Sequence, residues 1–273
     1  MLIWTFILGL ALVCLVTFAF VCQHLERNNP RHDAIAGMLY ACGRWYVRRM
    51  HRLQVRSQHH LPDNPGPLIV IANHTAGIDP ILIQCVCPFE IRWMMAADMR
   101  HPRGEPFWQW MKIIFVDRSR PDTNALRLAI RHVQAGGVLG IFPEGRIERP
   151  RGVLLPFQRG VGALVKQTGA TVLPVLVEGT PPADTAWGSI LKKSRSRVTF
   201  LAPVSYSDDR TSAQDIATDL ESRIAGAMKM DSTTTSRAAS DTDFQHHADS
   251  HPIDAARSRN KRHTDGGPIA AGM

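Results

Sequence analysis

A histidine and an aspartate five residues apart are the first candidates for chemistry in this sequence. His74 comes after the apolar run 68–72 and Asn73, and Asp79 stands before Pro80. A short apolar run of this kind is typical of a buried strand, which places His74 in the loop where a strand ends. An imidazole there can act as a general base near neutral pH, and a nearby carboxylate can accept its other ring N–H and fix the tautomer.

The same residues are also typical of a helix start. Asp79 would then be the N-cap and Pro80 the first helical residue, ahead of the apolar residues 81–83. Taken alone, capping is the commoner role of such an aspartate. The choice depends on the rest of the chain.

Charged residues follow two further apolar runs. Arg118 comes after 113–116, and its planar guanidinium suits a phosphate monoester, although an ordinary surface pair with Asp117 is the alternative. The run 138–142 ends at Pro143, and Glu144 and Gly145 follow it. This places a carboxylate beside a glycine, where the backbone can approach a ligand closely. The alternative for Glu144 is a turn carboxylate in a salt bridge.

Alternating strand-like and helix-like segments predict an α/β fold with a mostly parallel sheet covered by helices. Pro174 interrupts an otherwise central-looking strand and indicates a sheet edge, a bulge or a functional distortion, because proline cannot donate to the ladder. The predicted strands are 68–72, 91–96, 113–117, 137–142, 171–177 and 197–202, and the predicted helices are 80–87, 122–135, 158–168 and 212–229.

Four regions are predicted along the 273 residues. Residues 1–22 carry no charged side chain and are long enough to form a transmembrane or re-entrant anchor helix, with a cleaved signal peptide as the weaker alternative. Residues 23–60 hold seven arginines against two acidic residues and predict a basic amphipathic interfacial segment, which the positive-inside rule places on the cytoplasmic face. Residues 61–230 form the folded domain. The polar residues 231–273 are expected to be disordered.

In this order, the segments from about 60 to 205 resemble the lysophospholipid acyltransferase family typified by 1-acylglycerol-3-phosphate acyltransferase. The family's first motif is met by Asn73, His74 and Asp79, and its second by 115–118. The third resembles 142–145, with a continuation that fits 154–160, and the fourth includes Pro174 followed by Gly179-Thr180.

The resemblance implies that His74 is the base and Asp79 its orienting partner, activating the free hydroxyl of a lysophospholipid acceptor. It also implies that Arg118 grips the glycerol phosphate, with Glu144, Gly145 and Pro174 in the acceptor site. The acyl donor would be acyl-CoA or acyl carrier protein, with no cofactor and no metal. The implied place is phospholipid biosynthesis at the cell (inner) membrane, with the catalytic domain on the cytoplasmic face.

The third motif departs from the family pattern. The usual continuation is Gly-Thr-Arg-Ser, whereas Gly145 is followed here by Arg146-Ile147-Glu148, and Lys112 replaces a glycine that often begins the second motif. Arg146 would still reach the same anion from a shifted backbone. The departure leaves open an acyltransferase that uses a non-phosphatidic lyso-lipid, or an inactive lipid-binding scaffold.

Two other function classes fit the sequence less well. A metal hydrolase would use His74, Asp79 and Glu144, but a second well-placed histidine is missing. Nucleic-acid binding rests only on the net charge of +8, and much of that charge lies beside the apolar N-terminal segment, where it favours lipid instead.

Overall fold

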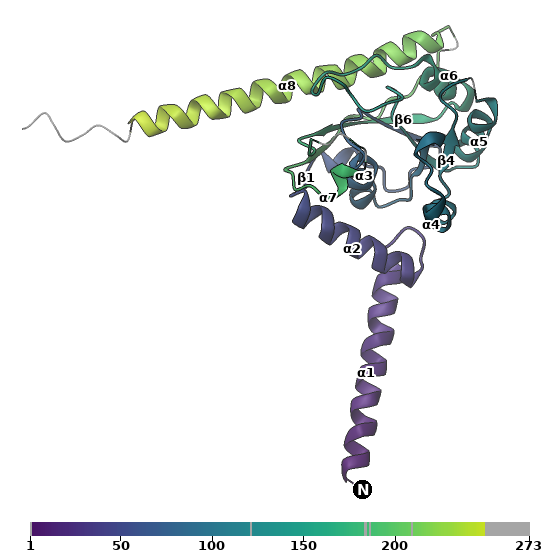
Figure 1. Cartoon of the computed structure of the whole chain (residues 1–273), viewed down its shortest axis with the longest axis vertical. Helices are drawn as coiled ribbons and strands as arrows, with labels where there is room; N and C mark the ends of the chain where they lie inside the picture. Colours follow the sequence, from purple (N-terminus) through teal and green to yellow (C-terminus); the bar gives the residue numbers. More distant parts are fainter. Residues whose placement is uncertain (1, 121, 183–184, 186, 209, 249–273) are drawn as a thin grey trace, which may run out of the picture. The chain divides into compact units, whose positions relative to one another are not determined.

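The computed structural model describes residues 2–120, 122–182, 185, 187–208 and 210–248, and these belong to two units, 1–227 and 228–273. The first unit contains a seven-stranded sheet (Figure 1). Its strands are β1 (Gln54–Arg56), β2 (Leu68–Ala72), β3 (Arg92–Ala96), β4 (Ile114–Val116), β5 (Val138–Ile141), β6 (Thr171–Glu178) and β7 (Arg197–Phe200). The helices are α1 (Leu2–Arg27), α2 (Ala34–Met50), α3 (Asp79–Val86), α4 (Glu105–Trp110), α5 (Thr123–Gln134), α6 (Arg159–Thr168), α7 (Gly188–Leu191) and α8 (Ala213–Ala248).

The sheet is mostly parallel, as predicted. Its strand order is β1-β7-β6-β2-β5-β3-β4, and the pair β6 and β7 is antiparallel while the other pairs are parallel. The strands β6, β2, β5, β3 and β4 therefore run in one direction, and their carboxyl ends meet at one edge of the sheet. Ligands of open parallel sheets bind at that edge, so residues that follow these strands are well placed for a site.

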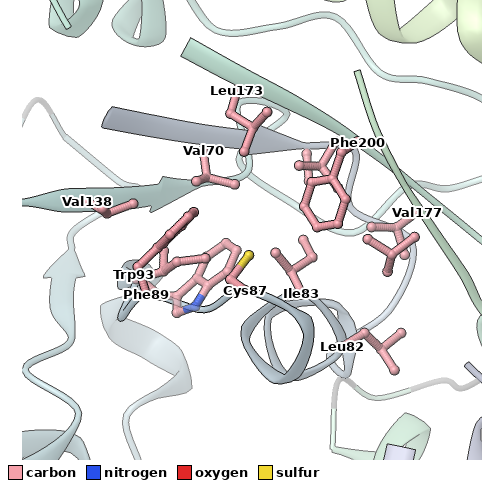
Figure 2. Close-up of a cluster of buried hydrophobic side chains, with 14 of the residues drawn as sticks. Val70, Leu82, Ile83, Cys87, Phe89, Trp93, Val138, Leu173, Val177 and Phe200 are labelled. Carbon is pink, nitrogen blue, oxygen red and sulfur yellow. The ribbon is translucent and has the colours of Figure 1, made fainter. Parts of the chain in front are cut away.

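Strand β2 is buried on both faces, which explains its uninterrupted apolar sequence. Leu68, Val70 and Ala72 belong to the core cluster that α3 completes with Leu82 and Ile83 (Figure 2). Side chains alternate between the faces of a strand, so Ile69 and Ile71 point to the opposite face. Both are fully buried as well. Helices therefore cover the two faces of the sheet at β2, and the loop that follows β2 has a rigid support.

Local signals define the helices around this sheet. Helix α5 begins after Asp122, whose carboxylate accepts a hydrogen bond from Ala125 N at 3.0 Å, as expected of an N-cap. Helix α6 ends at Gly169, whose φ of +62° is a conformation that glycine adopts without steric cost. These ends agree with the predicted helices to within one residue.

The sequence missed three short elements and misplaced one helix end. Strand β1 and helices α4 and α7 were not predicted, because segments of three to six residues show too little periodicity. Helix α8 continues to Ala248 instead of ending near 229, and residues 230–248 contain no glycine or proline that would stop it. The remaining part of the predicted tail, 249–273, lies outside the described residues.

The first two helices are joined by a tight turn and touch beside it. In the tight turn between them, the Asn29 side chain donates to the carbonyls of Leu25 at 2.6 Å and Asp33 at 3.0 Å. A Cβ added at Gly37 would lie 2.3 Å from the Leu25 carbonyl oxygen, so glycine allows the two helices to touch. Within α1, 9–27 is apolar enough to cross a membrane by length and composition, and α1 leads directly into this turn.

Candidate active site

His74 and Asp79 are in direct contact where β2 ends. The His74 Nδ1 atom lies 2.9 Å from Asp79 Oδ2, and the aspartate side chain is fully buried. The same Oδ2 accepts the backbone N–H groups of Thr75 at 2.7 Å and Ala76 at 2.8 Å. With these two donors the aspartate acts as an acceptor, so the His74 Nδ1 carries the proton and Nε2 is left as the basic nitrogen.

This geometry decides between the two interpretations of Asp79. Asp79 is the first residue of α3, and the residue before it, Ile78, makes no side-chain capping bond. The Asp79 carboxylate bonds backward to the loop 74–76 rather than forward to the first turn of its own helix. It therefore orients the histidine loop, and helix capping is not its role.

An aromatic stack sets the plane of the imidazole. The His74 ring lies parallel to that of Phe142, with centroids 4.1 Å apart, and Phe142 stacks in turn on Trp93 at 5.2 Å. Since Phe142 follows β5 and Trp93 lies in β3, three adjacent strands determine the ring's position. The His74 side chain is 18 % exposed, so the protein covers most of the ring.

Glu144 holds the histidine loop by its backbone. Its Oε1 accepts His74 N at 2.7 Å, its Oε2 accepts Leu155 N at 3.1 Å, and its side chain is buried. Burial raises the pKa of Glu144 to about 7, although the two backbone donors act in the opposite direction. The carboxylate is thus engaged with the protein itself, and its expected contact with an acceptor hydroxyl stays a prediction.

Arg118 links the second and third motifs. Its Nη1 donates to the Gly145 carbonyl at 3.1 Å, and its Nη2 pairs with Asp98 at 2.5 Å. Gly145 has a φ of +71°, which suits glycine and turns its carbonyl toward the arginine. The guanidinium is 43 % exposed, and an exposed pair with Asp98 contributes little stability. A phosphate group can therefore compete for this arginine at small cost. Arg146 follows Gly145 and is exposed.

Pro174 lies in the interior of the sheet, so of the three predicted alternatives the sheet edge is wrong. It pairs in register with Ile71 of β2, and β6 lies between β2 and β7. Its carbonyl accepts Leu201 N at 2.9 Å, one position before the β6–β7 register begins at Val175. On the other side of Pro174, Val172 pairs with Val204, so three steps along β6 stand against four steps along 200–204. Pro174 therefore lies at an irregularity of the ladder, of the bulge kind that the sequence offered as an alternative, where a missing donor is tolerated.

Several supporting residues received no role from the sequence. Asn73 clamps the start of the loop to β6, because its side chain donates to Val177 O at 2.9 Å and accepts Val177 N at 2.8 Å. The hydroxyl of Thr75 lies 3.1 Å from Asp79 Oδ1 and 2.8 Å from the hydroxyl of Thr180, which follows β6. The contact between the two threonines joins residues 105 positions apart, so the sequence gave no signal for it.

Glu148 is a second buried carboxyl beside the pair. Its backbone N–H donates to the His74 carbonyl at 2.8 Å, and its Oε1 accepts Gly152 N at 2.8 Å. Burial raises the pKa of Glu148, and the charge of Asp79 acts in the same direction. The segment after the third motif, where the sequence departs from the family pattern, therefore closes back onto the histidine loop.

The first amides of α3 are already bonded. Asp79 N donates to Ala76 O at 3.2 Å, and Ile81 N and Leu82 N donate to Ile78 O at 3.0 and 3.1 Å. The helix start therefore does not offer these groups to an oxyanion. Among the described residues, no group of three or more His, Cys, Asp or Glu side chains is arranged to hold a metal ion.

Comparisons with known proteins identify similar acyltransferases. Residues 52–178 match the family described as Acyltransferase. The chain is 32 % identical over 117 residues to the 1-acyl-sn-glycerol-3-phosphate acyltransferase of Borreliella burgdorferi, covering 41 % of this chain and 46 % of that protein. It is 20 % identical over 158 residues to the enzyme of the same name from Bacillus subtilis, covering 57 % of this chain and 75 % of that protein.

A solved structure has a similar fold. The crystal structure of the 1-acyl-sn-glycerophosphate acyltransferase of Thermotoga maritima superposes with a TM-score of 0.59 at 20 % sequence identity, covering 79 % of this chain and 88 % of that one. The match to the Borreliella burgdorferi protein spans about half of that protein's length.

Proposed function

Because residues 52–178 form a domain of the acyltransferase family, we propose that this protein transfers a fatty acyl group from a thioester to the free hydroxyl of a lysophospholipid. The donor is acyl-CoA or acyl-ACP, and the acceptor is lysophosphatidic acid, which becomes phosphatidic acid. The contact between His74 Nδ1 and the buried Asp79 carboxylate is the observation that carries this proposal.

The chemistry follows from the tautomer. His74 Nε2 removes the acceptor's hydroxyl proton as that oxygen attacks the thioester carbonyl, and the Asp79 carboxylate stabilises the imidazolium that forms. The tetrahedral intermediate then collapses, the carbon–sulfur bond breaks, and the imidazolium returns its proton to the departing thiolate. The products are the acylated lipid and a free thiol.

Binding of the acceptor is assigned to the cationic side of the site. Arg118 binds the phosphate, exchanging its exposed contact with Asp98 for a charge-assisted pair, and Arg146 lies next along the chain from Gly145. Holding acceptor and donor together supplies much of the rate. The apolar helix α1 keeps the site at the bilayer that contains both acceptor and product.

Release of thiol tests the reaction. The purified protein, given acyl-CoA and lysophosphatidic acid, is expected to release free thiol, and His74→Ala is expected to lose about two to four orders of magnitude in turnover because the base is gone. Normal turnover in that variant would end the assignment of His74. Activity that survives a chelator would exclude the metal hydrolase.

The altered third motif supports an alternative acceptor, a lyso-lipid with a headgroup other than that of lysophosphatidic acid. Gly145 is followed by Arg146-Ile147 in place of the family's Thr-Arg, so the cation near the acceptor is shifted by one residue. A panel of lyso-lipids with different headgroups separates the possibilities by thiol release. Lipid binding without thiol release across donors and acceptors would instead indicate a scaffold.

A further inference from the structure

Three exposed apolar side chains on α4 and around α7 have no role in the proposed reaction. Phe107 is 51 % exposed, Trp187 46 % and Leu191 81 %. Together they are called the aromatic rim below. Large exposed apolar groups that cluster on one surface commonly mark a contact with a partner or a membrane.

The two aromatic residues of the rim pack on one buried ring that leads toward the site. Trp108 lies buried beneath it, with ring centroids 5.1 Å from Phe107 and 5.7 Å from Trp187. Trp108 also meets Phe115 of β4 edge-on at 6.4 Å, and Phe115 is three residues before Arg118. The rim therefore borders the strand end that carries the predicted phosphate ligand.

The rim is also fixed to the N-terminal helices. The Arg31 guanidinium, in the turn between α1 and α2, lies 3.8 Å from the ring centroid of Trp110 at the end of α4 and donates to its carbonyl at 2.8 Å. On the other side, the Tyr46 hydroxyl of α2 donates to the carbonyl of Ile190 in α7. Figure 1 shows α7 near one end of α2 and α4 near the other. The rim is thus continuous with the helix that the apolar span of α1 enters.

Cationic side chains lie on the elements beside this surface. A groove on α2 is lined by Ala41, Arg44, Trp45, Arg48 and Arg49, and Trp45 is 68 % exposed. Lys192 and Lys193 follow α7 and are exposed. Exposed rings among arginines and lysines match the headgroup region of an anionic bilayer, where rings lie at headgroup depth and cations meet phosphates.

We propose that the aromatic rim inserts into the headgroup region of an anionic phospholipid bilayer, as a second membrane contact besides α1. The proposal rests on the proposed function, because a lipid acceptor must travel from the bilayer to His74. The rim brings the Arg118 side of the site to the membrane surface, so that the lyso-lipid headgroup reaches the site while its chain stays in the bilayer.

Photolabelling from the lipid tests this contact. The full chain is reconstituted into phosphatidylcholine vesicles containing phosphatidylglycerol and a phospholipid with a diazirine near the carbonyl end of its chain, and the labelled residues are mapped by mass spectrometry. Phe107, Trp187 and Leu191 are expected to be labelled several-fold above Leu128 of α5, a matched control that is 48 % exposed. Labelling of the rim at the level of Leu128 would overturn the proposal.

A kinetic measurement adds a second readout. Replacing both Phe107 and Trp187 by serine is expected to raise the KM for lyso-lipid presented in vesicles several-fold while the KM for acyl-CoA stays unchanged. Thiol release by the unaltered protein is followed in the same vesicles. Thiol release without rim labelling removes only the rim proposal, whereas rim labelling without thiol release removes only the acyl-transfer proposal.

Discussion

At the scale of single residues, the site depends on one oxygen atom. Asp79 Oδ2 accepts the His74 ring and two backbone N–H groups, so the loop 74–76 is wrapped around the carboxylate. An imidazole held in this way has one tautomer and one orientation before substrate arrives. Because the ring is already oriented, the entropy of orienting it does not add to the activation free energy of the proposed reaction.

Asp79→Asn tests this arrangement. The amide is a weaker acceptor and cannot stabilise an imidazolium, so we expect kcat to fall about 10²- to 10⁴-fold. We also expect a loss of roughly 1–3 kcal/mol in stability, because a buried acceptor is replaced. Turnover and thermal unfolding in detergent measure the two effects. Asp63→Asn, an exposed turn carboxylate, is the control, and equal activity of the two variants would remove Asp79 from the mechanism.

Glu144 gives the stability of the domain a pH dependence. Its pKa is about 7 in the folded protein, against 4.5 for the ordinary group, so the folded state holds a proton that the unfolded state has lost between these values. Stability contributed by this group is therefore full below pH 4.5 and falls as pH rises toward 7, by on the order of 3 kcal/mol.

Thermal unfolding of the full chain in micelles across this pH range measures the slope. Glu144→Gln does not titrate, so its curve is expected to be flatter than that of the unaltered protein, even if its overall stability is lower because a backbone N–H then faces an amide donor. Identical slopes in the two proteins would contradict the raised pKa.

At the scale of elements, the packing of α6 on α8 depends on one glycine. A Cβ at Gly162 would lie 1.8 Å from the Ala213 carbonyl oxygen, whereas a Cβ at Gly160 meets nothing within 4 Å. The two positions lie two residues apart in the same helix. Alanine substitutions at the two positions therefore distinguish the effect of close packing from the effect of helix propensity.

Gly162→Ala is expected to destabilise the protein by roughly 1–3 kcal/mol, because α6 must move away from the first residue of α8. Gly160→Ala is expected to be neutral or to stabilise by up to about 1 kcal/mol, since alanine favours helix. Thermal unfolding measures the stability of both variants. A Gly162→Ala protein as stable as the Gly160→Ala protein would show that α6 and α8 are not in contact there.

At the scale of the whole molecule, the proposed reaction requires the site to face the cytoplasm. The apolar helix α1 ends in His24 and Arg27, and α2 ends in Arg48 and Arg49. From the positive-inside rule we therefore expect the sheet on the cytoplasmic side of the membrane.

Sealed bacterial membrane vesicles of opposite orientation test this placement. Acyl-CoA does not cross the bilayer, so thiol release is expected from inverted vesicles and only after permeabilisation from right-side-out vesicles. Activity in intact right-side-out vesicles alone would reverse the assigned orientation.

The sequence by itself determined the elements whose signals are local. The apolar run 68–72 is observed as β2 without change, and Asp122 and Gly169 mark the ends of α5 and α6. The pair of His74 and Asp79 could also be predicted from the sequence, because only four residues separate them and one loop brings them together.

Only the tertiary structure decided what depends on distant partners. Pro174 lies in the sheet interior because β7 pairs with the residues after it, and Glu144 bonds the His74 backbone across 70 positions. Arg118 reaches Gly145, and Trp108 joins α4 to α7, in the same way. Periodicity and capping act over a few residues, whereas these contacts form only when the strands of the sheet have been brought side by side, so the residue types alone did not reveal them.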